Sequence, residues 1–270
     1  MNVNHEITDV EGYGLVTSVS ITADQTSRLQ PGKWLTCSLV DLYTYEVVNA
    51  FFESNPHRAG DVCLIPSSTW FHLAEGAGQI STGRQDQSIS PLEYTYIAIP
   101  ANGTGSHYFL CIITHASDLL VARNPSGAVR TTILVLDSLG KSCETPDLRQ
   151  KAVTLLSKFS LGQKLRQPEL KHLRLIRVPV PHQDNNHDCG LYPGHFLSVF
   201  LSDPETYTEH CLGKSLIVGS LESIWEVDRI STAREALLSL VHMATRYRHA
   251  AVSFDSRSTP DPLQQRQVNP

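Results

Sequence analysis

Apolar residues recur with two different periods along the chain. Over residues 34–54 they return mostly every three or four positions, which predicts a helix with one buried face that ends at the Asn-Pro pair 55–56. Three short apolar runs, rich in β-branched and aromatic residues, predict central strands over 94–99, 108–114 and 131–137. The first half of the chain therefore combines both kinds of element.

The second half continues this alternation. The pattern predicts helices over 145–161 and 231–249, a strand over 173–178 and a helix opened by Cys189. The shorter apolar runs of 57–93 predict only loops with a short helix or strand. Taken together, these elements predict an α+β fold.

Length and composition favour one domain. The 270 residues, 41% of them hydrophobic, are enough for one sizeable core. We expect an N-terminal extension over 1–21 and a globular domain over 22–250. Because residues 251–270 are polar and contain proline, we expect them to form a flexible tail.

Charge, cysteine content and hydropathy argue against several classes of protein. The net charge of -5 argues against a general nucleic-acid binder, which usually has a basic face. Six cysteines without a CxxC pair predict neither a zinc ribbon nor a disulfide framework, and they fit the reducing nucleus or cytoplasm. No signal peptide or bilayer-spanning run is visible. We expect a soluble monomer that makes no contact with membranes.

The strongest chemical signal lies in the stretch VPVPHQDNNHDCGLY. It places Gln183 six residues before Cys189, at the start of a predicted helix whose amides and dipole favour thiolate over thiol. Asp188 or Asn186 can cap this helix, and Pro193 fits its first turn. Cys189 is therefore a candidate nucleophile, with the Gln183 amide as a donor to an oxyanion. The alternative is a small buried core thiol.

A thiol nucleophile needs a histidine and an acceptor that orients it. His107 immediately precedes the predicted strand YFLCIIT and Asp137 ends the strand TTILVLD, so both lie at strand ends, where a side chain can reach a cleft. Alone, each has an ordinary explanation as a loop histidine or a turn cap. Together with Cys189 and Gln183 they favour a catalytic set. No comparable partners accompany the other candidates, His72, His115 and His172.

A metal site around the cysteine is the competing hypothesis. Imidazole, carboxylate and thiolate groups are all zinc ligands, but the spacing here matches no standard zinc pattern. A solvated polar loop that leads into a helix is the better explanation. The residues concerned are His182, Asp184, His187, Asp188, Cys189 and His195. We expect no metal and no cofactor.

The order of these motifs resembles the ubiquitin-like-protein-specific cysteine proteases, the SUMO (sentrin) protease family with its relative the adenovirus protease. In that family a helix begins near a Trp-Leu-Asn-Asp element and a histidine opens a strand. An aspartate then stands in an Asp-Ser turn, and a Gln-x5-Cys-Gly segment opens a second helix. Over about residues 22–205, the matching residues are Trp34-Leu35, His107-Tyr108, Asp137-Ser138, Gln183 and Asp188-Cys189-Gly190.

The resemblance implies a papain-like architecture with a mixed central sheet flanked by helices. It also implies cleavage of a peptide or isopeptide bond after the C-terminal Gly-Gly of a ubiquitin-like modifier, SUMO-type above all, or of its conjugates. In the implied roles Cys189 attacks the carbonyl carbon, His107 transfers the proton and Asp137 orients the imidazole ring. Gln183 and the Cys189 backbone amide stabilise the oxyanion.

The resemblance further implies a narrow tunnel in which the rings of Trp34 and Tyr108 flank the glycine tail. For Trp34, ordinary core packing is an equal alternative. The chain departs from the family here, since Thr36-Cys37 replaces Asn-Asp and Tyr108 replaces tryptophan. A polar stretch over 123–130 also lengthens the interval that follows Tyr108. These departures leave the catalytic set intact and leave open which modifier is recognised.

Two other functions stay open at this point. One is a deubiquitinase, acetyltransferase or viral-type protease with the same catalytic order, and the other is a module that binds a modifier without cleaving it. The presence of all four catalytic candidates favours an enzyme. A basic segment fits a solvated edge better than a site for an acidic partner; its residues are Lys164, Arg166, Lys171, Arg174 and Arg177.

Overall fold

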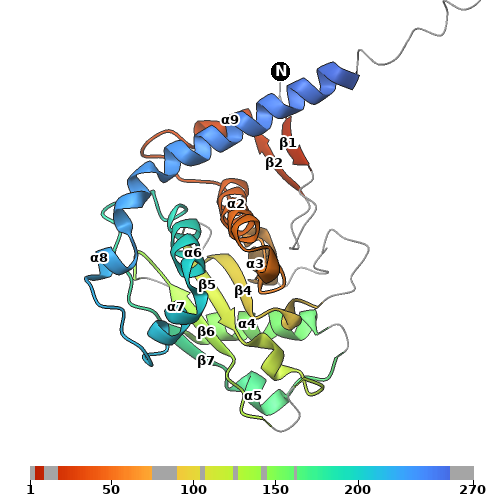
Figure 1. Cartoon of the computed structure of the whole chain (residues 1–270), viewed down its shortest axis with the longest axis vertical. Coiled ribbons are helices and arrows are strands. Elements are labelled where there is room, and N and C mark those ends of the chain that lie inside the picture. The colour runs from red at the N-terminus through yellow and green to blue at the C-terminus, as the bar shows by residue number, and fades with distance from the viewer. Residues whose placement is uncertain are drawn as a thin grey trace, which may run out of the picture.

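A five-stranded sheet with helices on both faces forms the centre of the molecule, and a separate two-stranded sheet lies on the far side of one of these helices (Figure 1). The computed structural model describes residues 4–8, 18–74, 90–103, 107–123, 127–140, 145–160 and 163–255. This arrangement of layers confirms the predicted α+β class with a mixed central sheet flanked by helices.

The sheet is mixed, and all of the predicted central strands lie inside it. In pairing order the strands are β3 (Val62–Leu64), β4 (Tyr96–Asn102), β5 (Tyr108–Thr114), β6 (Thr132–Leu136) and β7 (Arg174–Arg177). The two inner pairs, β4 with β5 and β5 with β6, are antiparallel, whereas the two outer pairs are parallel. The strand predicted over 173–178 is the edge strand β7.

Both faces of the inner strands are buried, which explains their continuous apolar sequence. On β5, Leu110 and Ile112 join the core on one face, while Phe109, Cys111 and Ile113 join the core on the other. Alternate side chains of a strand point to opposite faces, so a strand covered on both sides reads as an unbroken apolar run. This pattern made these strands predictable from the sequence.

Helices cover the two faces unequally. Most of the helical residues in the core on one face come from α2 (Cys37–Ser54), α6 (Tyr192–Ser202) and α9 (Ile230–Asp255). Two helices pack on the other face, α3 (Ser67–Ala74) and α4 (Thr145–Phe159). The shorter helices are α1 (Ala23–Ser27), α5 (Gln167–Lys171), α7 (Pro204–Cys211) and α8 (Leu221–Ile224). Within the described ranges, no helix combines the length and the apolar character that a bilayer crossing requires.

Two helices begin later than the sequence pattern predicted. Helix α2 starts at Cys37, because Thr36 before it has an extended backbone and acts as the N-cap residue. Helix α6 starts at Tyr192, with Pro193 in its first turn as predicted. Cys189 lies in the turn ahead of α6, so the prediction that it opens the helix is wrong. Capping by Asp188 is wrong as well, since Leu191 is the N-cap residue and makes no side-chain cap bond.

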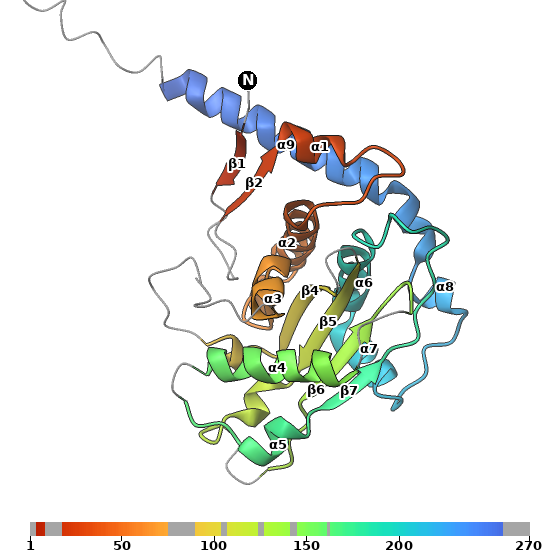
Figure 2. The same cartoon turned by 180° about the vertical axis from the view of Figure 1, so that it is seen from behind.

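The two ends of the described chain lie along one edge of the molecule. Strands β1 (Asn4–Thr8) and β2 (Ser18–Thr22) form an antiparallel pair beside α9 (Figures 1 and 2). Ile21 in β2 is fully buried in the core that α2 and α6 share. Helix α9 continues to Asp255, and residues 256–270 of the expected tail lie outside the described residues. The division of the chain into domains stays a prediction.

A glycine of α6 packs tightly against a tyrosine of α2. A Cβ atom added at Gly194 would lie 2.4 Å from Cδ1 of Tyr43 in α2. We expect Gly194→Ala to lower the free energy of unfolding by about 1–3 kcal/mol, because an aromatic ring in a packed contact must move. Urea denaturation measures this change. Gly60→Ala, where an added Cβ meets no atom within 4 Å, is the matched control; equal midpoints for the two variants would contradict the expectation.

Candidate active site

The sheet brings the predicted histidine and aspartate to the same edge. His107 stands immediately before β5 and Asp137 immediately after β6. These strands are antiparallel, and their register pairs Leu110 with Leu136, so the start of one lies beside the end of the other. The two side chains therefore leave adjacent strand ends on the same side of the sheet.

His107 and Asp137 form a short, largely buried hydrogen-bonded pair. Nε2 of His107 lies 2.6 Å from Oδ1 of Asp137, and the two side chains are only 13% and 6% exposed. The backbone N–H of Leu139 donates to the same Oδ1 atom at 3.0 Å, which favours a charged carboxylate. Asp137 thus fixes the ring so that Nδ1 is the nitrogen on the side away from the carboxylate.

The Cys189 side chain also interacts with this imidazole ring. Burial lowers the pKa of His107, but the hydrogen bond to Asp137 and the interaction with the Cys189 side chain outweigh burial and raise the pKa to about 9. Nδ1 is buried and makes no hydrogen bond of ordinary geometry within the described residues. The ring therefore interacts with both the carboxylate and the thiol, and these interactions favour a charged imidazolium.

Cys189 is held in a tight, buried turn. Its residue is only 3% exposed, and the N–H of Leu191 donates to the carbonyl of Asp188 at 2.8 Å across the turn. A Cβ atom added at Gly190 would lie 3.0 Å from Cβ of Leu35, in the segment that leads into α2. Glycine thus lets the start of α2 approach the nucleophile closely.

Ser138, which follows Asp137, holds Gln183 through two hydrogen bonds. The hydroxyl of Ser138 donates to Oε1 of Gln183 at 2.7 Å, and the backbone N–H of Gln183 donates to the carbonyl of Ser138 at 2.9 Å. Nε2 of Gln183 donates to the carbonyl of Asn185, which establishes which end of the amide carries the nitrogen. One N–H of the buried amide is left to donate elsewhere.

Asn185 and Arg234 shape the loop between Gln183 and Cys189, and sequence reasoning missed both. Oδ1 of Asn185 accepts the backbone N–H groups of His187 and Asp188, as in an Asx turn. Arg234 of α9 donates to Oδ1 of Asp188 through Nε at 2.9 Å and Nη2 at 2.6 Å. An asparagine in this loop is a recognisable turn signal, whereas Arg234 belongs to no local motif.

The predicted tunnel residues have contrasting environments. Trp34 is 51% exposed, so core packing does not account for its position before α2. Tyr108 is buried beside His107, and its hydroxyl lies 3.0 Å from Sγ of Cys37 at the start of α2. Burial, and then the contact with Cys37, raise the pKa of Tyr108, so the phenol stays neutral. Two of the three residues that depart from the family pattern, Cys37 and Tyr108, are thus in direct contact.

The competing histidines and the metal hypothesis find little support in the geometry. His115 lies at the opposite end of β5 from His107, with a left-handed backbone, and the His72 side chain lies outside the described residues. Nε2 of His195 faces the carbonyl of Trp225 at 2.6 Å. Across the side chains that are described, no group of three or more His, Cys, Asp or Glu residues is arranged to hold a metal ion.

Comparison with known proteins bears directly on this geometry. The sequence matches the Ulp1 protease family, C-terminal catalytic domain, over residues 70–218, which is more than half of the chain. The chain belongs to the Ulp1 protease family. The match contains His107, Asp137, Gln183 and Cys189, and it excludes Trp34.

Relatives and solved structures agree with this assignment. The chain is 24% identical over 261 residues to ubiquitin-like-specific protease 2 of Schizosaccharomyces pombe, covering 83% of this chain and 40% of that protein's own length. A crystal structure of a de-sumoylating protease superposes with a TM-score of 0.70 at 17% identity, covering 94% of this chain and 95% of that one. The C-terminal Ulp1 protease domain, solved in complex with the yeast SUMO ortholog Smt3, gives 0.50 at 18% identity over 91% and 90%. Both structures share the fold of this Ulp1-family chain.

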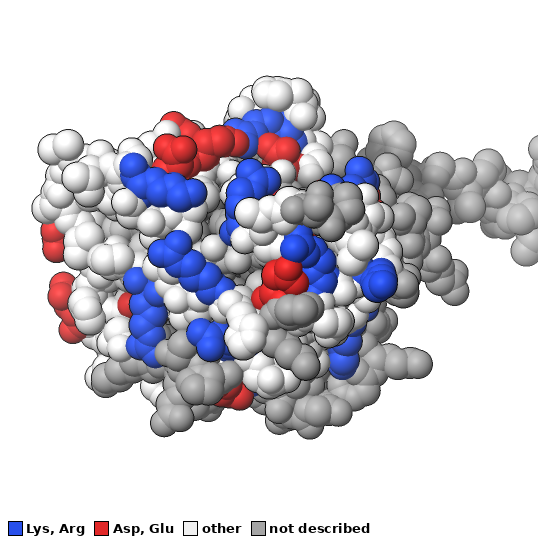
Figure 3. Space-filling model, turned by 90° about the horizontal axis from the view of Figure 1, so that it is seen from below, with Lys and Arg blue, Asp and Glu red and all other residues white. Residues whose placement is uncertain are grey.

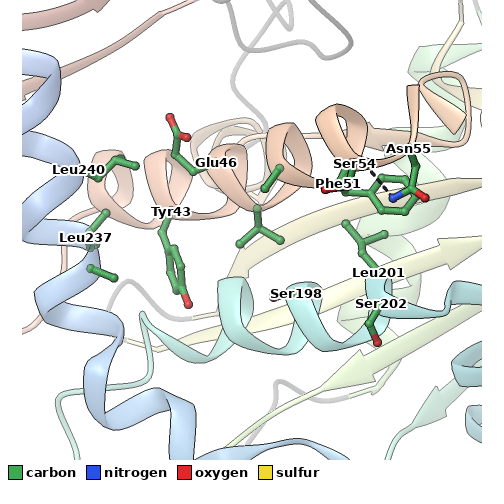
Figure 4. Close-up of a pocket in the computed structure, with 13 residues that line it drawn as sticks. Tyr43, Glu46, Phe51, Ser54, Asn55, Ser198, Leu201, Ser202, Leu237 and Leu240 are labelled. Carbon is green, nitrogen blue, oxygen red and sulfur yellow. Dashed lines mark hydrogen bonds between the residues drawn. The ribbon is translucent and has the colours of Figure 1, made fainter. Parts of the chain in front are cut away.

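An open groove of about 500 Å³ lies between α2, α6 and α9, away from the catalytic candidates (Figure 4). Leu237 and Leu240 of α9 border one end, while Phe51 and Leu201 border the other. None of the six site residues predicted from the sequence of this Ulp1-family protein lines the groove.

The basic segment lies on another surface, which includes the edge strand β7. Arg174 and Arg177 are exposed there. Figure 3 views this side of the Ulp1-family chain from below and shows Lys and Arg side chains spread over it, with Asp and Glu among them. Some of these cations pair locally, as Arg166 does with Glu169. The surface is therefore consistent with the predicted solvated edge.

Proposed function

We propose that this chain is a cysteine peptidase or isopeptidase that cleaves after the C-terminal Gly-Gly of a ubiquitin-like modifier, most of all a SUMO-type modifier. One observation carries the proposal: the His107 imidazole is hydrogen-bonded to the Asp137 carboxylate and also interacts with the Cys189 side chain. This arrangement supplies a nucleophile, a proton carrier and a group that orients the carrier.

In the first half of the reaction, the Cys189 thiolate attacks the carbonyl carbon of the terminal glycine. The carbonyl oxygen becomes an oxyanion, and the free N–H of Gln183 and the Cys189 backbone amide donate to it. The C–N bond then breaks, and the imidazolium of His107 gives its proton to the leaving amine. The products are the released amine and a thioester between the modifier and Cys189.

In the second half, water hydrolyses the thioester. His107, now neutral, accepts a proton from the water as the oxygen attacks the thioester carbon. The C–S bond breaks and restores the Cys189 thiolate beside the imidazolium, and the modifier leaves as a carboxylic acid, which loses its remaining proton to water. Asp137 holds the ring through both halves without accepting a proton itself.

The names of similar proteins support the choice of substrate. The relative in Schizosaccharomyces pombe is called a ubiquitin-like-specific protease, and the similar crystal structure is of a de-sumoylating protease. The exposed Trp34 and the buried Tyr108 are the residues that we propose to flank the glycine tail. Since Tyr108 contacts Cys37 in this chain, we infer that this pair tunes which modifier enters.

A panel of modifiers with a fluorogenic group on the terminal glycine tests the proposal. We expect turnover of a SUMO-type substrate, with ubiquitin at least about a hundredfold poorer, a ratio that differential binding at a tail-recognition site can supply. Preference for ubiquitin would indicate the deubiquitinase alternative. Tight binding of a modifier without turnover would indicate a binding module, and neither binding nor turnover would overturn the proposal.

The oxyanion role of Gln183 gives a separate prediction. Gln183→Ala should lower kcat by about a hundredfold with little change in KM, because a donor to the transition state is lost. Steady-state kinetics on the preferred substrate measure this effect. Gln163→Ala is the control, because Gln163 takes no part in the described hydrogen bonds of the catalytic residues. An unchanged kcat for Gln183→Ala would reassign this residue to loop structure.

The expectations about compartment and other partners remain part of this proposal. We infer a reducing environment, the nucleus or the cytoplasm, and this is supported by the absence of disulfides among the five described cysteines. That the protein is a monomer and binds neither nucleic acid nor membranes stays a prediction. Sedimentation, with and without the modifier, measures the oligomeric state.

A further inference from the structure

Arg234 contacts the two residues that immediately precede Trp34 and Cys189. Its Nη2 donates to the carbonyl of Lys33 at 2.6 Å and to Oδ1 of Asp188 at 2.6 Å. One guanidinium group thus joins the segment that carries a proposed tunnel residue to the segment that carries the nucleophile. These segments are far apart in the sequence, since Arg234 lies 201 residues from Lys33 and 46 from Asp188.

Further donors of the same side chain reinforce both connections. Nη1 of Arg234 donates to the carbonyl of Arg28 at 3.0 Å and, more weakly, to that of Gln30 at 3.4 Å. On the other side, Nε donates to Asp188 at 2.9 Å, and Nη2 reaches the carbonyl of His187 at 3.4 Å. The planar fork of arginine can serve both segments at once, which a lysine ammonium cannot do.

The setting makes these bonds stronger than ordinary surface contacts. The Arg234 side chain is 12% exposed and its partner Asp188 is 22% exposed, so water screens the pair only partly. Helix α9, which carries Arg234, is anchored in the core by Leu237 and Val241 and runs beside α1 and β2 (Figure 2). The guanidinium is therefore held in place by its helix and is not free to follow either segment.

We infer that Arg234 is a positioning residue for the proposed reaction, one that fixes the segment of Trp34 relative to the turn of Cys189. The inference rests on the proposed function, because it says that Arg234 couples binding of the glycine tail to placement of the nucleophile. Arg234 lies beyond the part of the chain that matches the family, residues 70–218. Helix α9 thus contributes to the active site from outside that match.

Arg234→Lys is the decisive variant, because it keeps a positive charge opposite Asp188 and removes the fork. We expect hydrogen exchange to accelerate by about tenfold or more in both segments, 28–34 and 185–191, the effect of losing one or two charge-assisted hydrogen bonds. With the preferred modifier, kcat should fall and KM should rise, lowering kcat/KM by about a hundredfold. Faster exchange in only one segment, or in neither, would overturn the inference.

Two further variants test whether each effect comes from the contacts of Arg234 with one particular segment. Asp188→Asn keeps an acceptor oxygen but loses its charge, so exchange should rise in 185–191 alone and KM should stay unchanged. Arg229→Lys is the matched control, because Arg229 lies immediately before α9, is 72% exposed and forms an ion pair only with Glu226 among the described residues. It should change neither segment. A rise in exchange over 28–34 with Arg229→Lys would contradict the assignment to Arg234.

The exchange measurement does not depend on the modifier, so the two proposals can fail separately. Absence of cleavage by the wild type would remove the proposed function but leave the coupling of the two segments testable. Normal cleavage with unchanged exchange in Arg234→Lys would remove the inference alone. If Arg234→Lys does not fold, hydrogen exchange of the wild type tests the inference instead. Segments 28–34 and 185–191 should then open with the same free energy, and different opening free energies would overturn the inference.

Discussion

Cys189→Ala should abolish turnover of every modifier substrate and leave modifier binding intact. The substitution removes the only group that the proposed mechanism uses to form the thioester. It removes little contact area, because Cys189 is almost fully buried and the modifier is proposed to bind chiefly through its tail and the surface around it. Turnover assays and a binding titration on the same preparation measure the two effects. Residual cleavage by Cys189→Ala would refute the assignment of the nucleophile.

A second cysteine provides the matched control. Cys63 in β3 is also buried, and burial alone raises the pKa of its thiol to about 12, so it is an unreactive structural residue. Cys63→Ala should keep full turnover and lose only about 1 kcal/mol of stability, the effect of a small cavity. Equal loss of activity in the two variants would indicate a general structural defect.

Asp137→Asn should lower kcat by a factor on the order of 10² to 10⁴, as the loss of the orienting carboxylate does in other hydrolases with a similar triad. The amide cannot stabilise the imidazolium as the carboxylate does, and it can stabilise the wrong tautomer of His107. KM should change little, since Asp137 faces the histidine ring. Asp118→Asn is the control, because Asp118 also pairs with a cation, Arg130, but lies near the other end of the sheet.

The same variant should change the pH dependence. The pKa of His107 is raised to about 9, so the wild type should keep a charged imidazolium paired with Asp137 up to that pH and lose activity as the pH rises through it. Because the folded pKa lies above the ordinary 6.5, the stabilisation from this pair is complete below pH 6.5 and is lost toward pH 9.

In Asp137→Asn the group that raises the pKa of His107 most strongly is gone, so the alkaline limb should move to lower pH. Profiles of kcat/KM between about pH 6 and 10 measure the shift. An alkaline limb that stays in place would contradict the role of Asp137 in holding the imidazolium charged.

The catalytic edge of the sheet was predictable because burial leaves a strong pattern. Strand β5 has the bounds that its apolar run predicted, and β6 lies within the run over 131–137. Once both strands are placed, side chains at their adjacent ends are expected to lie close together. The structure brings two of them, His107 and Asp137, within hydrogen-bonding distance. Local sequence carried this information because neighbouring strands were also neighbours in the chain.

Other parts of the site depend on contacts that no local pattern records. The predicted helix at Cys189 begins only at Tyr192, because the preceding residues form a turn closed by the carbonyl of Asp188. Asp188 was expected to cap this helix, but its carboxylate pairs with Arg234 of α9. The spacing of apolar residues predicts which face of α9 is buried, but it does not predict which distant backbone groups the Arg234 side chain contacts.

The contact between Cys37 and Tyr108 is another feature that the sequence did not predict. Each residue was recognised as a departure from the family, but nothing in the sequence indicated that the two lie 3.0 Å apart. A phenol hydroxyl with a thiol as its partner occupies the position where the family has a larger indole ring. The two departures therefore form one local change in the proposed tunnel wall.

The central claim is that Cys189 is the nucleophile of an enzyme specific for a ubiquitin-like modifier. The most direct test is intact-mass spectrometry of the protein after incubation with SUMO-type and ubiquitin probes that carry a propargyl group at the terminal glycine. We predict one covalent adduct with a SUMO-type probe, located at Cys189 by peptide mapping and absent from Cys189→Ala. Absence of an adduct with every modifier, or an adduct that persists in Cys189→Ala, would contradict the claim.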